Sequence, residues 1–191
     1  MTGLQHDEPG RAGALGTWGL GVAAAAMAAI VAASNFLVQF PINDWLTWGA
    51  FAYPVAFLVT DLTNRTFGPA LARRVVYVGF AFGVVLSIWL ATLRIAVASG
   101  TAFLLSQLAD VYVFDRLRRL PWWQAPLISS ILASILDTAL FFSLAFAGTD
   151  LPWVTWALGV LGIKLAVAVV MLIPFRVLMP FLAPRVEPET S

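Results

Sequence analysis

Five charged residues lie within or beside long apolar stretches of the sequence: Asp61, Arg94, Asp110, Asp137 and Lys164. Even the mildest insertion scale assigns about 2.5 to 3.5 kcal/mol to one charge at the centre of a membrane helix. Each of these residues therefore needs a partner or a function. Carboxylates and an ammonium group in such a setting form ion pairs, bind a polar substrate or carry a proton. They are our first candidates for a functional site.

Asp137 and Lys164 are predicted to lie at nearly the same depth on neighbouring helices. At 1.5 Å per residue they fall about 15 Å and about 17 Å below the outer surface. A mutual ion pair is the simplest way to hold both charges in a low dielectric. Such a pair either fixes only the register of the two helices or belongs to a substrate site. The second alternative is favoured because Ser130, Ser134 and Asp137 share one helical face, with Phe141 one turn beyond.

A second polar stripe follows residues 99–110. On a helix, Ser99, Ser106, Gln107 and Asp110 fall within an arc of about 100°, and Phe103 lies between them. The serines alone carry little weight, because interhelical hydrogen bonds from serine are common in membrane bundles. A buried amide such as Gln107 needs both its donors and its acceptor satisfied, which is also what recognition of a heterocycle edge requires.

Three further polar candidates have simple structural alternatives. Asn35 lies toward the outer end of the first apolar stretch. For Asp61 and Asp110, near the predicted cytoplasmic ends of their helices, the alternative is a salt bridge to a nearby arginine. Arg94 is expected at the outer interface, where a long side chain reaches water by snorkelling.

The elements that position these residues must be membrane helices. Of 191 residues, 61% are hydrophobic and only 11% are charged, and the mean hydropathy is +0.89. A soluble domain carries about 25% charged residues. The apolar stretches run for about 20 residues without the alternation that a barrel strand shows. This composition excludes an ordinary cytosolic enzyme, a disordered regulator and a nucleic-acid-binding module.

Hydropathy predicts an all-α membrane protein with six transmembrane helices. The predicted spans are residues 18–40, 45–64, 75–93, 95–114, 122–147 and 153–178. They form one transmembrane domain, residues 18–182, between a flexible cytoplasmic N-terminus (1–17) and a flexible cytoplasmic tail (183–191). Arginines cluster in alternate loops and near the C-terminus, so the positive-inside rule places both termini in the cytoplasm.

The two halves of the chain show a weak internal repeat. The matching pairs are Ser34-Asn35 with Ser106-Gln107, and Thr60-Asp61 with Asp137-Thr138. Three spans per half would invert the second half relative to the first. Inverted 3+3 repeats enclose a substrate site near the membrane midplane and allow alternating access.

Gly79 and Gly83 form a step of two small residues four positions apart. This spacing lets helix backbones approach closely. The contact is expected either inside the bundle or between the protomers of a homodimer.

The sequence contains few residues that could act as catalytic groups. The single histidine, His6, precedes the first span, and the chain has no cysteine. A membrane-embedded Ser-His dyad and histidine or thiolate metal sites are therefore excluded. No glycine-rich phosphate loop is present, so we expect no ATP hydrolysis by the chain itself. We predict a non-enzyme without cofactor or metal: a carrier, a substrate-binding subunit, a channel or a structural membrane protein.

Three segments resemble the signatures of a known family. They read YPVAFLVTDLTNRTFG (53–68), ASGTAFLLSQLADVYVF (98–114) and SSILASILDTALFF (129–142). As an ordered set over about residues 20–180 they resemble the queuosine precursor transporters, within the vitamin uptake transporter group. Arg65 stands at a position where family members often look acidic.

The resemblance implies inward transport of 7-deazaguanine bases across a bacterial inner membrane for queuosine synthesis in tRNA. The bases are 7-cyano-7-deazaguanine and its aminomethyl relative. A guanine-like edge offers N–H donors to a carboxylate and a carbonyl to an amide or ammonium group, and its flat ring needs an aromatic slot. The substrate-binding candidates are Asn35, Asp61, Arg94, Phe103, Gln107, Asp110, Asp137, Phe141 and Lys164, with Trp89 as a further aromatic.

The sequence leaves the energy source open. Facilitated diffusion, proton coupling and docking on a separate ATPase module all stay as alternatives. In the last case the chain would be the substrate-binding subunit of an energy-coupling-factor transporter. A structural membrane protein that transports nothing is the alternative from another class.

Overall fold

The computed structural model describes residues 9–37, 40–43, 46–90 and 92–182. The helices in this part of the chain are α1 (Pro9–Leu37), α2 (Gly49–Phe67), α3 (Pro69–Leu90), α4 (Leu93–Leu117), α5 (Gln124–Phe146) and α6 (Trp153–Leu182). The predicted helical architecture is thus confirmed. α1 begins at Pro9, earlier than the predicted start at residue 18. The expected flexibility of the two ends falls largely outside the described residues.

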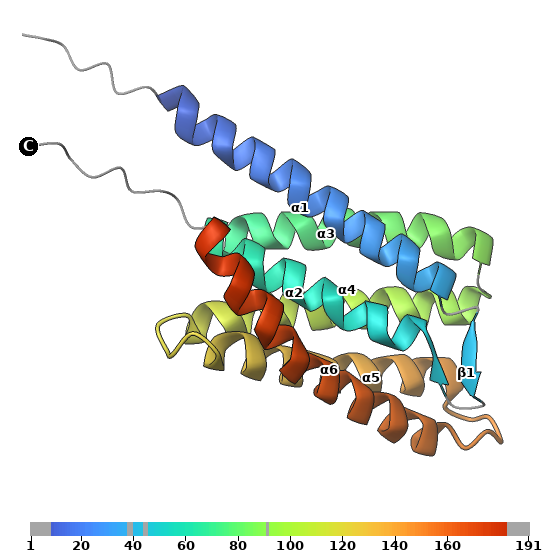
Figure 1. Cartoon of the computed structure of the whole chain (residues 1–191). Helices are drawn as coiled ribbons and strands as arrows, with labels where there is room; N and C mark the ends of the chain where they lie inside the picture. Colours follow the sequence, from blue (N-terminus) through green and yellow to red (C-terminus); the bar gives the residue numbers. More distant parts are fainter. Residues whose placement is uncertain (1–8, 38–39, 44–45, 91, 183–191) are drawn as a thin grey trace, which may run out of the picture.

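A short hairpin that the sequence did not predict connects α1 to α2. Strand β1 (Pro41–Asn43) pairs antiparallel with β2 (Leu46–Thr47). Residues 46 and 47 had been assigned to the second span, and α2 begins only at Gly49. The hairpin lies at the end of the bundle opposite the start of α1 and the end of α6 (Figure 1).

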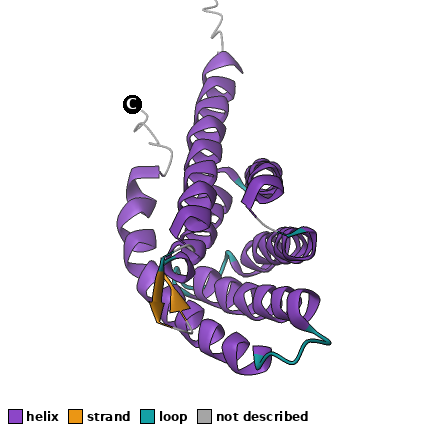
Figure 2. Cartoon of the chain, turned by 90° about the vertical axis from the view of Figure 1, so that its right-hand side faces the viewer, coloured by secondary structure: helices purple, strands orange, loops and turns teal. Residues whose placement is uncertain are grey.

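The helices pack as a bundle around α2. α2 contacts α1, α3, α4, α5 and α6, while the most extensive pairing of all joins α4 to α5 (Figure 2). Successive helices run in alternating directions, so α1 begins and α6 ends at the same end of the molecule (Figure 1). An arrangement of this kind returns both ends of the described chain to one side.

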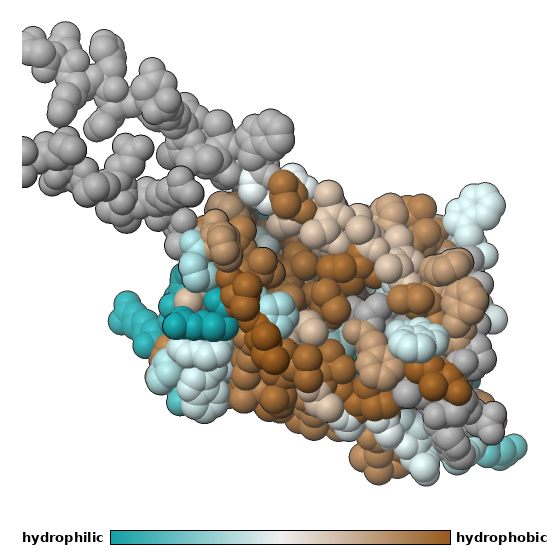
Figure 3. Space-filling view, viewed as in Figure 1, coloured by the Kyte–Doolittle hydropathy of each residue, from teal (hydrophilic) through white to brown (hydrophobic). Residues whose placement is uncertain are grey.

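Four helices are long and apolar enough to cross a membrane: α4, α5, α6 and most of α3. α1 contributes a shorter apolar stretch, Gly19–Ser34. α2 is more polar because it is enclosed by its neighbours, and its buried face carries Thr60, Asp61 and Asn64. On the face seen in Figure 3, hydrophobic residues cover the middle of the molecule, and hydrophilic residues gather toward its ends, most densely at the end where α6 ends.

Two apolar clusters hold the bundle together. The first joins α1 to α2, α3 and α4 through residues such as Met27, Val75 and Phe103. The second joins α2, α4, α5 and α6 and includes Phe114 and Phe175, whose ring centroids are 6.2 Å apart. The polar side chains described below lie on the faces that α2, α4, α5 and α6 turn toward one another.

The small-residue step on α3 makes its contact inside the bundle. A Cβ atom at Gly79 would come within 2.5 Å of Met27 Cγ on α1, so only glycine lets the two helices approach this closely. At Gly83 the corresponding distance, to Val31 Cγ1, is 3.6 Å, which is an ordinary contact. The structure accounts for the first glycine without a second protomer.

The two halves do not repeat each other's contacts in full. α1 packs on both α2 and α3, whereas α4 packs on α5 without a comparable contact to α6. The predicted inverted repeat stays a prediction.

Candidate functional site

Buried polar side chains form a continuous cluster between α2, α4, α5 and α6. Its members are Thr60, Asp61, Asn64, Ser106, Gln107, Asp110, Ser129, Ser130, Ser134, Asp137, Thr138 and Lys164. The two polar stripes predicted on residues 99–110 and 130–137 supply half of them. An apolar exterior around a polar interior is the arrangement of a membrane bundle that binds a polar ligand.

Asp137 and Lys164 form the ion pair that the sequence predicted. Lys164 Nζ donates to Asp137 Oδ2, and it lies 3.4 Å from Thr138 Oγ1. Ser106 Oγ donates to the other carboxylate oxygen, Oδ1, at 3.4 Å. Only 5% of the Asp137 side chain and 8% of the Lys164 side chain are exposed. The two charges neutralise each other at the interface of α5 and α6.

Asp61 receives its hydrogen bonds from α5. Ser129 Oγ donates to Asp61 Oδ1 and Ser130 Oγ donates to Oδ2, each at 3.4 Å. Ser129 is not among the site residues predicted from the sequence. Helical spacing could have found it, because residues 129, 130, 133 and 137 share one face of a helix.

The structural alternative for Asp61 and Asp110, a salt bridge to a nearby arginine, is not formed within the described residues. Arg65 instead donates to the carbonyl oxygen of Arg118 at 2.6 Å. Arg118 pairs with Asp115 at 3.1 Å and donates to the carbonyl oxygens of Asn64 and Arg65. These two arginines therefore join the carboxyl-terminal ends of α2 and α4 and do not pair with Asp61 or Asp110.

Gln107 and Asp110 carry polar atoms without a partner in the part of the chain that the structure describes. Gln107 Oε1 accepts a hydrogen bond of 2.7 Å from Thr60 Oγ1, but its Nε2 has no partner. Both carboxylate oxygens of Asp110 also have none. The two residues are fully buried, at 0% exposure. Buried polar groups are nearly always satisfied, so these atoms call for a donor and an acceptor supplied from elsewhere.

Asp61 and Asp110 face each other from α2 and α4. The two carboxyl groups lie close enough to interact electrostatically, and Ser129 lies near both. Because Asp110 makes no hydrogen bond within the described chain, its oxygens are available for a proton or for the N–H groups of a ligand.

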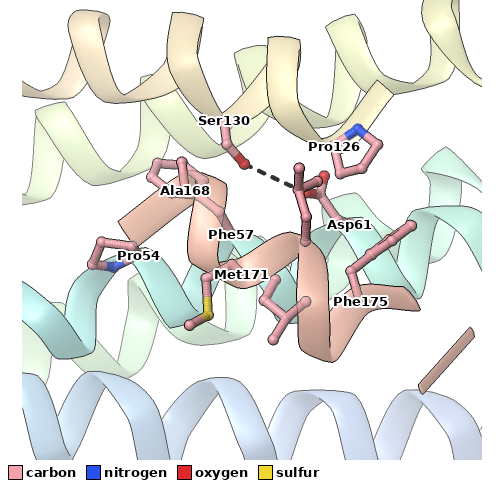
Figure 4. A pocket seen from close by; sticks show the side chains of 10 residues that line it. Pro54, Phe57, Asp61, Pro126, Ser130, Ala168, Met171 and Phe175 are labelled. Atoms are coloured by element: carbon pink, nitrogen blue, oxygen red, sulfur yellow. Dashed lines mark hydrogen bonds between the residues drawn. The ribbon is translucent and has the colours of Figure 1, made fainter. Parts of the chain in front are cut away.

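A groove reaches this cluster from the surface between α2, α5 and α6. Its enclosed volume is about 10 Å³, room for about one water molecule. Asp61 and Ser130 supply its polar lining, and Phe57, Met171 and Phe175 are among its apolar lining (Figure 4). Pro54, inside α2, also borders it. Of the paired carboxyl groups, the one on Asp61 is thus the more accessible.

Arg94 lies apart from the cluster. Its guanidinium donates to the carbonyl oxygens of Leu144 and Ala147, at 3.1 and 2.7 Å. These carbonyls belong to the carboxyl-terminal end of α5, where cations are favoured by the helix dipole. The structure brings Arg94 to a capping position rather than to the other candidates.

The aromatic candidates also lie in different parts of the structure and not together. Phe103 belongs to the apolar cluster with α1 and α3. Phe141 packs against Phe142 and Phe146, with ring centroids 5.2 and 6.1 Å apart. Trp89 is 82% exposed. The side chain of Asn35 lies outside the described part of the structure.

Known transporters are similar to this chain over most of its length. A family model described as "Putative vitamin uptake transporter" matches residues 47–93 and 86–179. The "Queuosine precursor transporter" of Escherichia coli is 36% identical over 192 residues, covering 85% of this chain and 87% of that protein. The chain belongs to the queuosine precursor transporter family, within the vitamin uptake transporter group.

Two further relatives carry the same kind of name. The "Probable queuosine precursor transporter" of Haemophilus influenzae is 35% identical over 186 residues, with 76% of this chain and 79% of that protein covered. The protein of that name from Bacillus subtilis is 31% identical over 130 residues, with 53% and 57% covered. No solved structure matches this chain. Family membership agrees with the expectation of a membrane protein that is not an enzyme.

Proposed function

We propose that this protein imports queuosine precursors across the bacterial inner membrane, as 7-cyano-7-deazaguanine, 7-aminomethyl-7-deazaguanine or both. The observation that carries the proposal is the match to queuosine precursor transporters over most of the chain. The buried polar cluster between α2, α4, α5 and α6 supports it, since a base that hydrogen-bonds needs such groups inside an apolar bundle.

The cluster contains the chemistry that a deazaguanine needs. Its edge presents a carbonyl acceptor, a ring N–H and an amino group, which match an amide or ammonium donor and a carboxylate acceptor. Asp61, Asp110 and Asp137 are the buried acceptors, and Gln107 and Lys164 are the buried donors. The substrate is held between the helices, where no water competes for these hydrogen bonds.

We expect both ends of the chain to face the cytoplasm. Arginines of the α2–α3 and α4–α5 turns lie at the end of the bundle where α1 begins and α6 ends. The positive-inside rule places that end in the cytoplasm. The Asp61–Asp110 pair then lies toward the inner side and the Asp137–Lys164 pair toward the outer side, so a base crosses from one to the other.

The first experiment is a thermal-shift series on the purified chain in detergent. Both deazaguanine precursors are compared with guanine, biotin and riboflavin. A ligand at about 100 times its Kd stabilises the folded state by about 2.7 kcal/mol. We expect stabilisation by the deazaguanines alone. Stabilisation by biotin or riboflavin instead would show that the proposed substrate is wrong.

Uptake in cells tests transport itself. The chain is expressed in a host that lacks both its own importer and precursor synthesis, and queuosine in tRNA is measured after either precursor is added to the medium. We expect queuosine to appear at low external precursor only when the chain is present. Co-purification of ATPase subunits with an active chain would instead support the energy-coupling-factor alternative.

A further inference from the structure

We propose that Gln107 and Asp110 together read the hydrogen-bonding edge of a guanine-type base. The Gln107 amide donates to the ring carbonyl, and the Asp110 carboxylate accepts from the ring N–H and from the exocyclic amino group. This inference rests on the proposed function, because it names the groups that select the substrate in that site.

Gln107 is held in the orientation that this role requires. Thr60 Oγ1 donates to Gln107 Oε1 at 2.7 Å, so the amide nitrogen points away from α2. That nitrogen has no partner among the described residues, and the side chain is 0% exposed. An oriented amide with an unused donor is prepared to bind an acceptor that arrives later.

Asp110 offers the complementary acceptors one helical turn away. Neither of its carboxylate oxygens has a partner in the described chain, and the residue is 0% exposed. Its nearest charged neighbour is another carboxyl group, that of Asp61, rather than a lysine or arginine. A ligand with two N–H donors satisfies both oxygens at once.

The Asp137–Lys164 pair is less suited to reading a base. Its carboxylate already accepts from Lys164 and from Ser106. A base bound there would have to displace one of these partners, and a buried charge would lose its counter-ion. Asn64 Oδ1 and Ser134 Oγ also lack partners among the described residues, but of the predicted substrate-binding residues Gln107 and Asp110 are the two with such atoms.

The spacing of the two residues matches the edge of guanine. Side chains at positions i and i+3 lie on the same helix face, with about 5 to 6 Å between their Cβ atoms. One amide donor beside a two-oxygen acceptor complements the order carbonyl, N–H, amino group along the base. An adenine-type edge places an amino donor against the Gln107 donor and is rejected.

Access to this edge runs through the groove described above. Asp61 lines the groove and adjoins Asp110, so a base that separates α2, α5 and α6 at this point meets Asp61 first. The groove holds about 10 Å³ in this structure and must widen to admit the base. The apolar lining provided by Phe57, Met171 and Phe175 suits the flat ring of the base.

Binding of three probes to the purified full chain tests the inference. The probes are 7-cyano-7-deazaguanine, its analogue without the 2-amino group (7-cyano-7-deazahypoxanthine), and 7-cyano-7-deazaadenine. With the unaltered chain we expect Kd to be about 10- to 100-fold weaker for the analogue without the amino group. We expect no binding of the adenine analogue at the same concentrations.

Two variants separate the two contacts. Asp110→Asn is expected to weaken the binding of 7-cyano-7-deazaguanine, so that its Kd comes close to that of the analogue without the amino group. Gln107→Leu is expected to raise the Kd of both ligands about tenfold. The ratio of the two Kd values should stay unchanged, because both ligands keep the carbonyl. Asp115→Asn is the matched control on α4, since Asp115 pairs with Arg118 outside the cluster. It should leave both Kd values unchanged.

The outcomes distinguish this inference from the proposed function. Equal affinity of the unaltered chain for the guanine and hypoxanthine analogues overturns the edge-reading role, even if neither variant folds. An unchanged Kd ratio in a folded Asp110→Asn variant also overturns it. In both cases the proposed function is still supported if the unaltered chain binds 7-cyano-7-deazaguanine. No binding of any deazaguanine by the folded, unaltered chain overturns the proposed function and this inference together.

Discussion

Lys164 on α6 donates a hydrogen bond to Asp137 on α5, and both side chains are buried where the two helices meet. A buried ion pair of this kind is costly to break and nearly neutral to replace. It is therefore a point where a structural role and a transport role can be separated by experiment.

The first prediction concerns this ion pair. Asp137→Asn or Lys164→Met alone leaves one buried charge unpaired and should destabilise the protein by about 3 to 5 kcal/mol. The double variant removes both charges and should recover most of that stability in thermal unfolding. We expect uptake to stay abolished in the double variant, because the proposed path of the base passes Asp137. Recovery of uptake along with stability would assign the pair a purely structural role.

The second prediction concerns Thr60 as the residue that orients Gln107. Thr60→Val removes the hydrogen bond to Gln107 Oε1 and should raise the Kd for 7-cyano-7-deazaguanine about 2- to 10-fold. Thr63→Val is the matched control, because Thr63 Oγ1 donates to the carbonyl of Val59 on its own helix, at 2.7 Å. Equal effects of the two substitutions would argue against a positioning role for Thr60.

The Asp137–Lys164 contact was predictable because few variables determine it. Helices have a fixed rise per residue, and the short α5–α6 connection ties the outer ends of the two helices together. Counting inward from that connection therefore locates both residues at one depth. The buried faces of α4 and α5 were predictable for a similar reason, since helical periodicity alone groups their polar residues.

The partners of Arg65 could not be derived in this way. Arg65 lies four residues after Asp61, a spacing that normally favours an ion pair along a helix. In the fold its guanidinium instead reaches the carbonyl of Arg118 at the end of α4. Helix ends carry unpaired carbonyls and attract cations, but which helix ends nearby depends on the tertiary packing. The unpartnered atoms of Gln107 and Asp110 depend on packing in the same way.

Hydropathy alone also does not explain why α2 is so polar. A helix in contact with lipid needs an apolar face, but α2 is enclosed by the other helices. Its composition therefore reflects neighbours that are distant in sequence. The β1–β2 hairpin before it was missed because its strands are only three and two residues long, too short to show a periodic pattern.

The third prediction concerns the close approach of α1 and α3. Gly79→Val places side-chain atoms against Met27 and should destabilise the protein by about 1 to 3 kcal/mol. Met27→Ala in the same chain removes the clash and should restore part of the loss. Gly83→Ala is the control, since a Cβ there makes only an ordinary contact with Val31. Thermal unfolding in detergent compares the variants, and a stable Gly79→Val protein would contradict the packing described here.

The fourth prediction separates Arg94 from the transport site. Arg94→Ala removes the cap on α5 and should lower the unfolding temperature. It should change the Kd for 7-cyano-7-deazaguanine by less than about twofold, because Arg94 contacts no member of the polar cluster. A large loss of affinity with unchanged stability would return Arg94 to the list of substrate-binding residues.

The last prediction tests the orientation of the bundle. The chain has no cysteine, so single cysteines can report which side of the membrane each turn faces. Arg119→Cys lies in the α4–α5 turn, at the end where the described chain ends meet, and Asp150→Cys lies in the α5–α6 turn at the other end. Both positions are exposed. In intact cells a membrane-impermeant thiol reagent should label Asp150→Cys and spare Arg119→Cys, because the positive-inside rule places the arginine-rich end in the cytoplasm. The opposite labelling pattern would invert the bundle, and the Asp61–Asp110 pair would then lie toward the outer side.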